Sequence, residues 1–382
     1  MPPKTHALLS ASSANRWLHC PPSARLNELC EDRGSDYAAE GTAAHALCEY
    51  KLKRALGMEA QNPTENLSWF NEEMDDCAEG YAAFVMEQVA FAKEHCTDPV
   101  VLIEQRVDFS RWVEQGFGTA DCVIIADGVL QVIDYKHGLG FLVSAEDNPQ
   151  MKCYALGALE LFDGIYEVET VEMIIYQPRR GNVSTFELKK DELYCWAEEV
   201  LKPTADLAFA GDGTFLCGEW CAFCKAKHTC RARADANMQL ARFDFKLPPM
   251  LTDEEIEEIL GKADGLVSWA NDIKEYALQA AVGGKAWNGW KLVEGRSNRK
   301  YISEEAVAKR VSGAGYDPYE QKVLGVTAMQ KLLGKTRFEE LLNGYIEKPQ
   351  GKPTLVPESD KRPAYELTQQ AESAKNDFKE DN

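Results

Sequence analysis

Gly118-Thr-Ala-Asp-Cys-Val-Ile-Ile-Ala126 and Val129-Leu-Gln-Val-Ile-Asp-Tyr-Lys136 are two largely apolar runs that the turn Asp127-Gly128 separates. Apolar runs on either side of an Asp-Gly turn predict a β-hairpin. Its two strands are antiparallel, so the start of the first lies beside the end of the second. We therefore expect Asp121, Asp134 and Lys136 to converge at one end of the hairpin.

These three side chains suit the hydrolysis of a phosphodiester. Hard divalent cations such as Mg²⁺ and Mn²⁺ prefer carboxylate oxygens, which Asp121 and Asp134 would supply, and such ions stabilise the attacking and leaving oxygens. A lysine next to them, as Lys136 would be, can orient the water and offset charge on the phosphate. A D-x-K triplet also occurs at ordinary strand ends, so the assignment depends on other segments.

Size and composition are those of a soluble protein with more than one domain. The chain has 382 residues, of which 45% are hydrophobic and 27% charged. It contains no run of eighteen apolar residues, and the start Met1-Pro-Pro-Lys-Thr-His6 lacks a signal-peptide core. We expect a cytoplasmic protein with no membrane partner.

The acidic charge lies mainly in the first part of the chain. The net charge is −20, and residues 1–230 hold 19 Lys and Arg against 37 Asp and Glu, whereas residues 231–382 hold 23 against 25. Binding of a polyanion normally draws on a basic surface. If the substrate is DNA, metal ions and a local groove must attract it, or the C-terminal part must help to hold it.

The order of expected elements defines the fold class. A serine-rich start, Ser10 to Ser13, predicts a short helix that Pro21 ends. Helical spacing predicts further helices over residues 37–56, 74–95, 149–159 and 191–209. Apolar runs predict strands over residues 100–107, 168–176 and 183–188 in addition to the hairpin. This order predicts an α/β fold, a mixed β-sheet flanked by helices.

Residues 231–382 form a different, mainly helical region. Helices are expected over residues 253–260, 267–277, 303–312 and 326–343, with a strand over 290–294. From residue 348 the chain is rich in Pro and charged residues, which is typical of a mobile tail. The expected domains are residues 1–235, residues 236–347, and the tail 348–382.

Several residues outside the hairpin could belong to a site, but each is a weak indicator alone. His45 and Glu49 are one helical turn apart, and a lone histidine in a helix more often packs than binds a ligand. Gln150 and Tyr154 share a helix face, where a cap and a half-buried ring are the ordinary roles. Glu104 would approach the carboxylates from a neighbouring strand, but a charged residue at a strand end is usually solvated.

The cysteines favour a metal or cluster over disulfides, because the chain is large and lacks a secretion signal. Cys217, Cys221, Cys224, His228 and Cys230 fall within one short segment. Zn²⁺ bound entirely within residues 217–230 is one interpretation. An iron–sulfur cluster on the last three cysteines and a distant fourth thiolate is the other.

The ordered set of motifs resembles the RecB-type nucleases of the PD-(D/E)xK superfamily, in particular their iron–sulfur members such as AddB and the CRISPR-associated RecB-like exonucleases. It is also similar to a phage-borne, uncharacterised branch with an extra C-terminal region. The motifs, in chain order, are the serine-rich start to Cys20-Pro21, Gly41 and His45, Gly118 and Asp121, Asp134 and Lys136, Gln150 and Tyr154, and Cys221, Cys224 and Cys230. The resemblance covers about residues 8–235.

The resemblance implies a restriction-endonuclease-like core with a Mg²⁺- or Mn²⁺-dependent DNA exonuclease activity. His45, Asp121 and Asp134 would bind the metal, with the Tyr135 carbonyl as a further ligand, and Lys136 would act on the water nucleophile.

The same resemblance implies a substrate groove and an iron–sulfur cluster. Gln150 and Tyr154 would line the groove for DNA. A [4Fe–4S] cluster would be held by Cys20, Cys221, Cys224 and Cys230, joining both ends of the nuclease domain, although Cys217 could replace Cys20 in a local zinc site. A phage or prophage origin in a bacterial host and a role in recombination, replication or repair would follow. Expected partners are a recombinase, a helicase or a single-strand-binding protein, and a catalytically inactive DNA-binding adaptor is the alternative.

Overall fold

The computed structural model describes residues 7–30, 36–67, 69–162, 165–239, 251–293, 301–319, 323–342, 344–347 and 356. The chain divides into two compact units, residues 1–285 and residues 286–382. The first unit contains the sheet and all of the candidate site residues. Among the described helices, none has a stretch long and apolar enough to cross a lipid bilayer.

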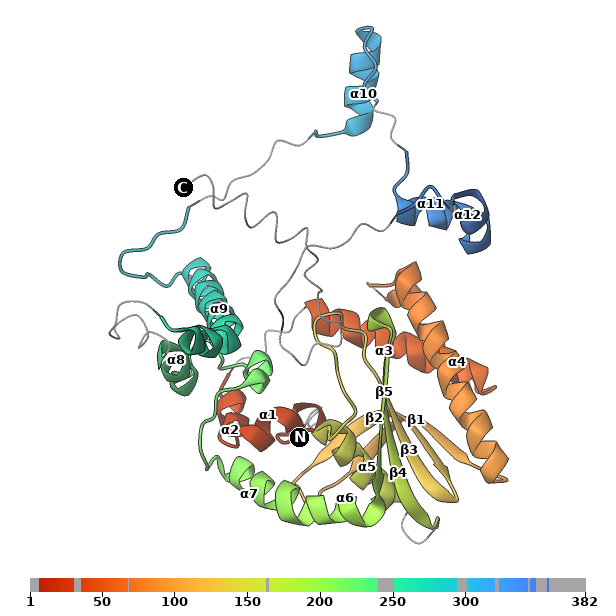
Figure 1. Ribbon diagram of the computed structural model, residues 1–382, viewed down its shortest axis with the longest axis vertical. Helices are drawn as coiled ribbons and strands as arrows, with labels where there is room; N and C mark the ends of the chain where they lie inside the picture. The colour runs from red at the N-terminus through yellow and green to blue at the C-terminus, as the bar shows by residue number, and fades with distance from the viewer. Residues whose placement is uncertain are drawn as a thin grey trace. The chain divides into compact units, whose positions relative to one another are not determined.

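One sheet of five strands forms the centre of the first unit (Figure 1). Its strands lie in chain order: β1 (Val100–Asp108), β2 (Phe117–Ala126), β3 (Gly128–Tyr135), β4 (Val168–Gln177) and β5 (Asn182–Lys189). The pair β3 and β4 is parallel and the other pairs are antiparallel. The expected hairpin and the mixed character of the sheet are therefore confirmed.

Helices cover both faces of this sheet, as expected for an α/β fold. One face packs against the elements η1 (Ala11–Ser13), α1 (Ala14–His19), α5 (Pro149–Leu161), α6 (Lys190–Trp196), η4 (Ala197–Leu201) and α7 (Lys202–Ala210). The other face packs against α3 (Asp36–Ala55) and α4 (Glu72–His95). Alternate residues of β2 enter the two cores, Val123 and Ile125 one of them, Cys122 and Ile124 the other, because successive strand side chains point to opposite faces.

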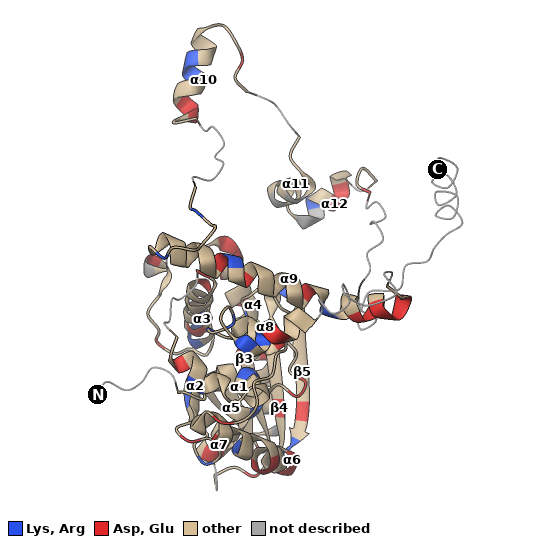
Figure 2. Cartoon of the chain, turned by 90° about the vertical axis from the view of Figure 1, so that its left-hand side faces the viewer, with Lys and Arg blue, Asp and Glu red and all other residues tan. Residues whose placement is uncertain are grey.

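Short elements complete the first unit. They are α2 (Ser23–Glu28), η2 (Thr64–Asn66), η3 (Pro178–Arg180), η5 (Glu219–Phe223) and α8 (Arg231–Met238). Basic residues of α8 are visible in blue beside the N-terminal helices in Figure 2. The first helices lie next to the segment that carries the clustered cysteines, because α1 contacts η5 and Asn27 of α2 donates to Cys224 Sγ, although about two hundred residues separate them in sequence.

The long helix α9 (Asp253–Val282) corrects the expectation of two helices in this region. Its predicted start is confirmed, because Thr252 and Glu255 form a capping box. The helix continues through Gly261 and Gly265, since a glycine costs only about 1 kcal/mol in a helix interior. The first compact unit extends past the boundary expected at residue 235 because Asp272 of α9 pairs with Lys227.

The second unit consists of short helices where it is described. They are α10 (Glu304–Gly313), α11 (Val326–Leu333) and α12 (Lys335–Leu342). The single helix expected over residues 326–343 is divided at Gly334, which has φ +71°. The strand expected over residues 290–294 is wrong for the described residues 290–293. They are irregular, Trp290 is 83% exposed, and none of the described strands pairs with them. The predicted tail lies outside the described residues except Val356.

Helix α5 packs unusually close to β1 at Gly157. A Cβ atom built there would lie 2.9 Å from Val107 Cβ and 3.1 Å from the backbone N and O of Asp108. Backbone atoms of a paired strand cannot move aside easily, so Gly157→Ala should lower the free energy of unfolding by about 1–3 kcal/mol. Denaturant titration of the purified variant measures this loss.

Gly41→Ala in α3 is the matched control, because nothing lies within 4 Å of its Cβ position. That change should leave stability equal or slightly higher, since alanine favours a helix. Equal stability of the Gly157→Ala protein and the wild type would contradict the close packing of α5 on β1.

Candidate metal centre and cysteine cavity

The three charged side chains of the hairpin converge, as the sequence predicts. Cys122 of β2 pairs with Ile133 of the antiparallel strand β3. Their neighbours Asp121 and Asp134 therefore lie next to each other on these two strands. Asp121 Oδ2 accepts a hydrogen bond from the backbone N–H of Tyr135 at 2.7 Å. Both aspartates are buried, Asp134 with only 2% of its surface exposed. Two buried carboxylates this close require cations nearby.

Lys136 supplies one such cation, and α5 holds it in place. Its Nζ lies 2.8 Å from Asp134 Oδ2, an oxygen that lacks an aligned hydrogen-bond donor. Lys136 Nζ donates to Gln150 Oε1 at 3.2 Å, and Gln150 Nε2 donates to Asp134 Oδ1 at 3.0 Å. Gln150 Nε2 also lies 3.2 Å from the Tyr154 hydroxyl. The structure thus brings the predicted pair Gln150 and Tyr154 to the D-x-K residues, and Gln150 bridges the aspartate and the lysine.

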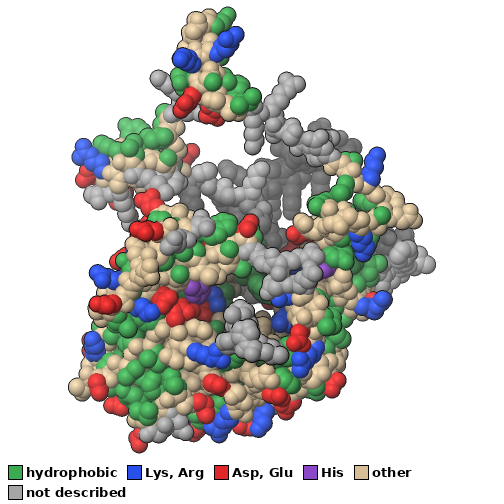
Figure 3. Space-filling model, turned by 180° about the vertical axis from the view of Figure 1, so that it is seen from behind, with side chains coloured by type: hydrophobic (Ala, Val, Ile, Leu, Met, Phe, Trp, Pro, Cys, Tyr) green, Lys and Arg blue, Asp and Glu red, His purple; other side chains and the backbone are tan. Residues whose placement is uncertain are grey.

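His45 and Glu104 complete the centre from two other elements. His45 Nδ1, on α3, lies 3.2 Å from Asp121 Oδ1. One ligand atom each from His45, Glu104 and Asp121 lies within 4.8 Å of the others. The expectation that Glu104 is merely a solvated residue at a strand end is therefore wrong. His45 keeps 34% of its side chain exposed, so the centre is open to solvent. Figure 3 shows histidine next to acidic side chains in a hollow of the surface.

The backbone turns Glu104 toward the centre. Glu104 and Asp121 face each other between the pairs Ile103–Cys122 and Gln105–Ala120 and do not themselves pair. Glu104 has φ +50°, a left-handed conformation that is rare for a non-glycine residue inside a strand. Such conformations cluster at ligand sites, where the surrounding structure holds them. The sequence signal was a lone carboxylate after four apolar residues, but the conformation that aims it cannot be read from sequence.

Burial and mutual repulsion raise the pKa values of Glu104 and Asp134. Burial and the Asp121 charge raise the pKa of Glu104 to about 7. Burial, together with the charge of Asp121, also raises the pKa of Asp134. Burial disfavours charge on His45, but Asp121 outweighs it and raises the pKa of His45 to about 9. A divalent cation bound among these groups would relieve the repulsion.

A buried polar network connects the centre to α3. The Tyr135 hydroxyl lies 2.8 Å from His137 Nδ1, and His137 Nε2 lies 3.4 Å from Glu40 Oε1. Arg179 Nη1 donates to the same Glu40 oxygen at 3.0 Å. Because Glu40 precedes His45 on α3, these bonds fix the helix that carries the histidine. Sequence reasoning missed His137 and Glu40, since their burial depends on how α3 packs on the sheet.

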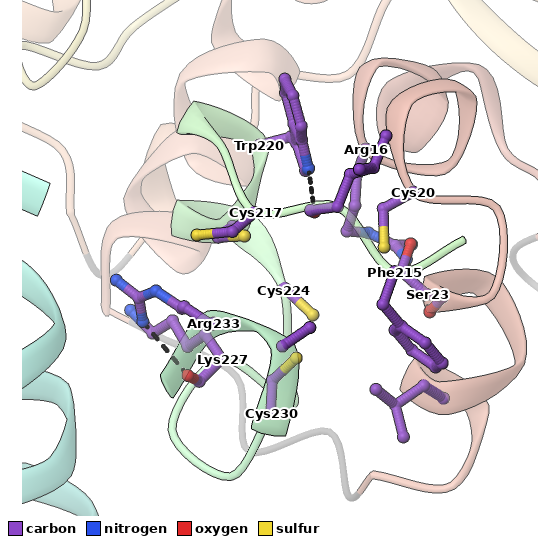
Figure 4. A pocket seen from close by; sticks show the side chains of 14 residues that line it. Arg16, Cys20, Ser23, Phe215, Cys217, Trp220, Cys224, Lys227, Cys230 and Arg233 are labelled. Atoms are coloured by element: carbon purple, nitrogen blue, oxygen red, sulfur yellow. Dashed lines mark hydrogen bonds between the residues drawn. The ribbon is translucent and has the colours of Figure 1, made fainter. Parts of the chain in front are cut away.

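The clustered cysteines form a second candidate centre in the same unit. A small cavity is lined by Cys20, Cys217, Cys221, Cys224 and Cys230. In Figure 4 the sulfur atoms of Cys20, Cys224 and Cys230 point into the space between the N-terminal helices and the cysteine segment. The structure thus brings the isolated Cys20 to its predicted partners. Cys217, the extra cysteine, lies there too, and the hydrogen bond from Cys221 lowers the pKa of its thiol to about 7.

The cysteine sulfur atoms of the described residues are not gathered into a compact tetrahedral set. A tetrahedral zinc site with Zn–S bonds of about 2.3 Å needs sulfur atoms about 3.8 Å apart. Within the described parts of the chain, three cysteine Sγ atoms never come within 4.8 Å of one another. The buried Arg16 and Arg233 also line the cavity. Their positive charges would offset those of several thiolates, and Asn27 Nδ2 donates to Cys224 Sγ at 3.1 Å.

Fold and site together define an α/β domain with a mixed sheet, a carboxylate–histidine centre at its edge and a cysteine-lined cavity. Residues 6–363 match a family described as "Protein of unknown function (DUF2800)", and the chain belongs to this family. A solved structure titled "Crystal structure of SSO0001" is similar over 49% of this chain and 95% of that one, with 14% sequence identity and a TM-score of 0.24.

Glu104→Gln should weaken binding of Mn²⁺ at the tightest site at least tenfold, because one charged oxygen ligand becomes neutral. Isothermal titration of the metal-free protein with Mn²⁺ measures this affinity. Glu114→Gln, an exposed residue in the connection between β1 and β2, should bind Mn²⁺ like the wild type. Unchanged affinity in a folded Glu104→Gln protein would remove Glu104 from the centre.

Proposed function

We propose that this chain is a metal-dependent DNA nuclease, an exonuclease of the RecB type with a restriction-endonuclease-like core. The observation that supports this most is the meeting of His45, Glu104 and Asp121 beside the Asp134–Lys136 pair. Carboxylate and imidazole ligands for a divalent ion, with a lysine beside them, are a set that can support phosphodiester hydrolysis.

In this proposal His45, Glu104, Asp121 and Asp134 hold Mg²⁺ or Mn²⁺. Such ions, when bound, stabilise charge on the attacking and leaving oxygens of the phosphodiester. Asp121 is already oriented for this role, because the Tyr135 N–H holds one of its oxygens at 2.7 Å while His45 faces the other. Asp134 Oδ2 lies 2.8 Å from Lys136 Nζ, so a metal ion bound by this oxygen would share it with the lysine.

Lys136 acts in the proposal as a permanent cation and hydrogen-bond donor. Burial disfavours its charge, but the adjacent Asp134 outweighs this and raises the pKa of Lys136. The ammonium group therefore keeps its proton near neutral pH. It orients the attacking water and offsets charge on the phosphate, and Gln150 keeps it directed by accepting one of its hydrogen bonds.

The cysteine cavity has a structural role in the proposal. Cys20, Cys221, Cys224 and Cys230 would hold a [4Fe–4S] cluster, which would join the N-terminal helices to the end of the nuclease domain. The alternative, a zinc ion on residues 217–230, needs the sulfur atoms to approach one another more closely than they do.

A catalytically inactive DNA-binding adaptor is the second candidate function. The net charge of −20 favours it in one respect, because an acidic protein attracts free DNA poorly. In either case a partner such as a recombinase, helicase or single-strand-binding protein would deliver the strand. A cytoplasmic location in a bacterial host, with a phage or prophage gene, belongs to the same proposal.

Lys136→Ala and Asp134→Ala should each reduce Mg²⁺-dependent cleavage of end-labelled DNA at least a hundredfold, since each change removes a charge at the reacting phosphate. EDTA should abolish the wild-type activity. Lys93→Ala, an exposed lysine on α4, should cleave normally. Full cleavage by both variants would refute the nuclease assignment, and absence of cleavage in the wild type would favour the adaptor.

Protein purified without oxygen should contain about four irons per chain and absorb broadly at about 400 nm, as expected for a [4Fe–4S] cluster. Cys20→Ala should lose both signals, because it removes the ligand from the N-terminal helices. Cys217→Ala is the matched control and should retain them. Zinc without iron, bound equally by the Cys20→Ala protein, would establish the local zinc site instead.

A further inference from the structure

The loop between Lys136 and Pro149 joins the two halves of the candidate nuclease site. The loop starts directly after the D-x-K residues and ends where α5 begins, the helix that carries Gln150 and Tyr154. Gln177, buried at the end of β4, holds the backbone of this loop. Gln177 Nε2 donates to the carbonyls of Gly138 and Phe141, each at 2.8 Å, and Gln177 Oε1 accepts from Val143 N at 3.2 Å.

Three further side chains bind the same backbone. Arg180 Nη1 donates to the Leu139 carbonyl at 2.7 Å. Asn182 Nδ2 donates to the Val143 carbonyl at 3.0 Å, and Ser184 Oγ accepts from Ala145 N at 2.9 Å. The loop is thus attached along its length to η3 and β5, and its conformation is set before any ligand binds.

The loop directs apolar side chains to the solvent in spite of this anchoring. Leu139 and Leu142 are about half exposed, and Phe141 is 62% exposed. The Phe141 ring meets the ring of Phe223, itself 71% exposed, with centroids 5.6 Å apart and planes at 61°. Phe223 directly precedes Cys224, so the two rings connect the loop of the metal centre to the cysteine segment. Exposed aromatic side chains on a fixed backbone indicate a binding surface.

Basic side chains accompany the two rings. Arg180 lies under the loop, and Lys225 follows Phe223 by two residues; both are exposed. Aromatic faces with neighbouring basic groups are the means by which proteins bind single-stranded nucleic acid, because bases stack on the rings and phosphates meet the cations. Stacking does not depend on net charge. It would therefore allow a protein with a net charge of −20 to hold a polyanion.

We infer that Phe141 and Phe223 form a stacking surface for the bases of a single DNA strand, and that this surface guides the strand to the metal centre. This inference rests on the proposed function and names its substrate class. A duplex keeps its bases stacked on one another, so only an unpaired strand or a frayed end presents bases to exposed rings. The surface thus selects single-stranded DNA over an intact duplex.

Binding of a fluorescent oligo(dT) to the full chain tests this inference, measured by anisotropy with Ca²⁺ in place of Mg²⁺ to prevent cleavage. Phe141→Ala and Phe223→Ala should each weaken the affinity about tenfold, the order of magnitude expected for the loss of one stacked base. Phe141→Trp should restore it. The salt dependence should stay the same, because no charge is removed. Phe91→Ala, an exposed phenylalanine on α4 at the opposite face of the sheet, is the matched control.

Wild-type affinity in the double variant Phe141→Ala/Phe223→Ala would overturn the inference, as would an equal loss with Phe91→Ala. If the double variant bound DNA normally but lost a self-association of the wild type, the surface would be a dimer contact. The result of this binding test can be distinguished from the result of the cleavage test of the proposed function. A protein without cleavage whose oligo(dT) affinity still falls in the two variants would be a single-strand-binding adaptor, whereas normal affinity in a cleaving protein would refute the surface alone.

Discussion

The buried carboxylate of Asp121 is the constraint on which the centre of this structure depends. One oxygen accepts the N–H of Tyr135 at the end of β3, and the other faces His45 of α3. A charged group inside a protein is tolerated only when such partners replace water. Asp121 therefore joins the hairpin to a helix on the far side of the sheet. On the opposite face of the sheet, the buried Asp134 likewise has partners that replace water. It pairs with Lys136 and accepts a hydrogen bond from Gln150 of α5, which also accepts one from Lys136.

A second connection organises the other end of the unit. Asn27 of α2 donates to Cys224 Sγ and accepts from the backbone N–H of Lys225 at 2.7 Å. Cys20, only a few residues earlier, lines the same cavity. The N-terminal helices thus reach the cysteine segment without any cofactor contact. A cluster bound there would strengthen a contact that the polypeptide already makes, and the loop with Phe141 meets this segment through Phe223.

Most elements of the first unit were predictable because their patterns are local. The turn at Gly128, the alternation along β2 and the proline at the start of α5 each follow from a few neighbouring residues. Two of the errors, in α9 and around Trp290, arose where local signals conflict with the whole fold. Gly261 suggested a break that a well-capped helix does not need, and the apolar residues around Trp290 lack a partner strand among the described residues.

By itself the sequence determined the positions of the strands along the chain, the meeting of Asp121 with Asp134 and Lys136, and the spacing of the cysteines, since hairpin register and helical periodicity are properties of neighbouring residues. Only the tertiary structure decided that Glu104 faces the centre and that His137 and Glu40 support α3. It alone also placed Phe141 beside Phe223. These contacts join segments far apart in the chain, and their geometry depends on packing and on one unusual backbone angle, which no local pattern encodes.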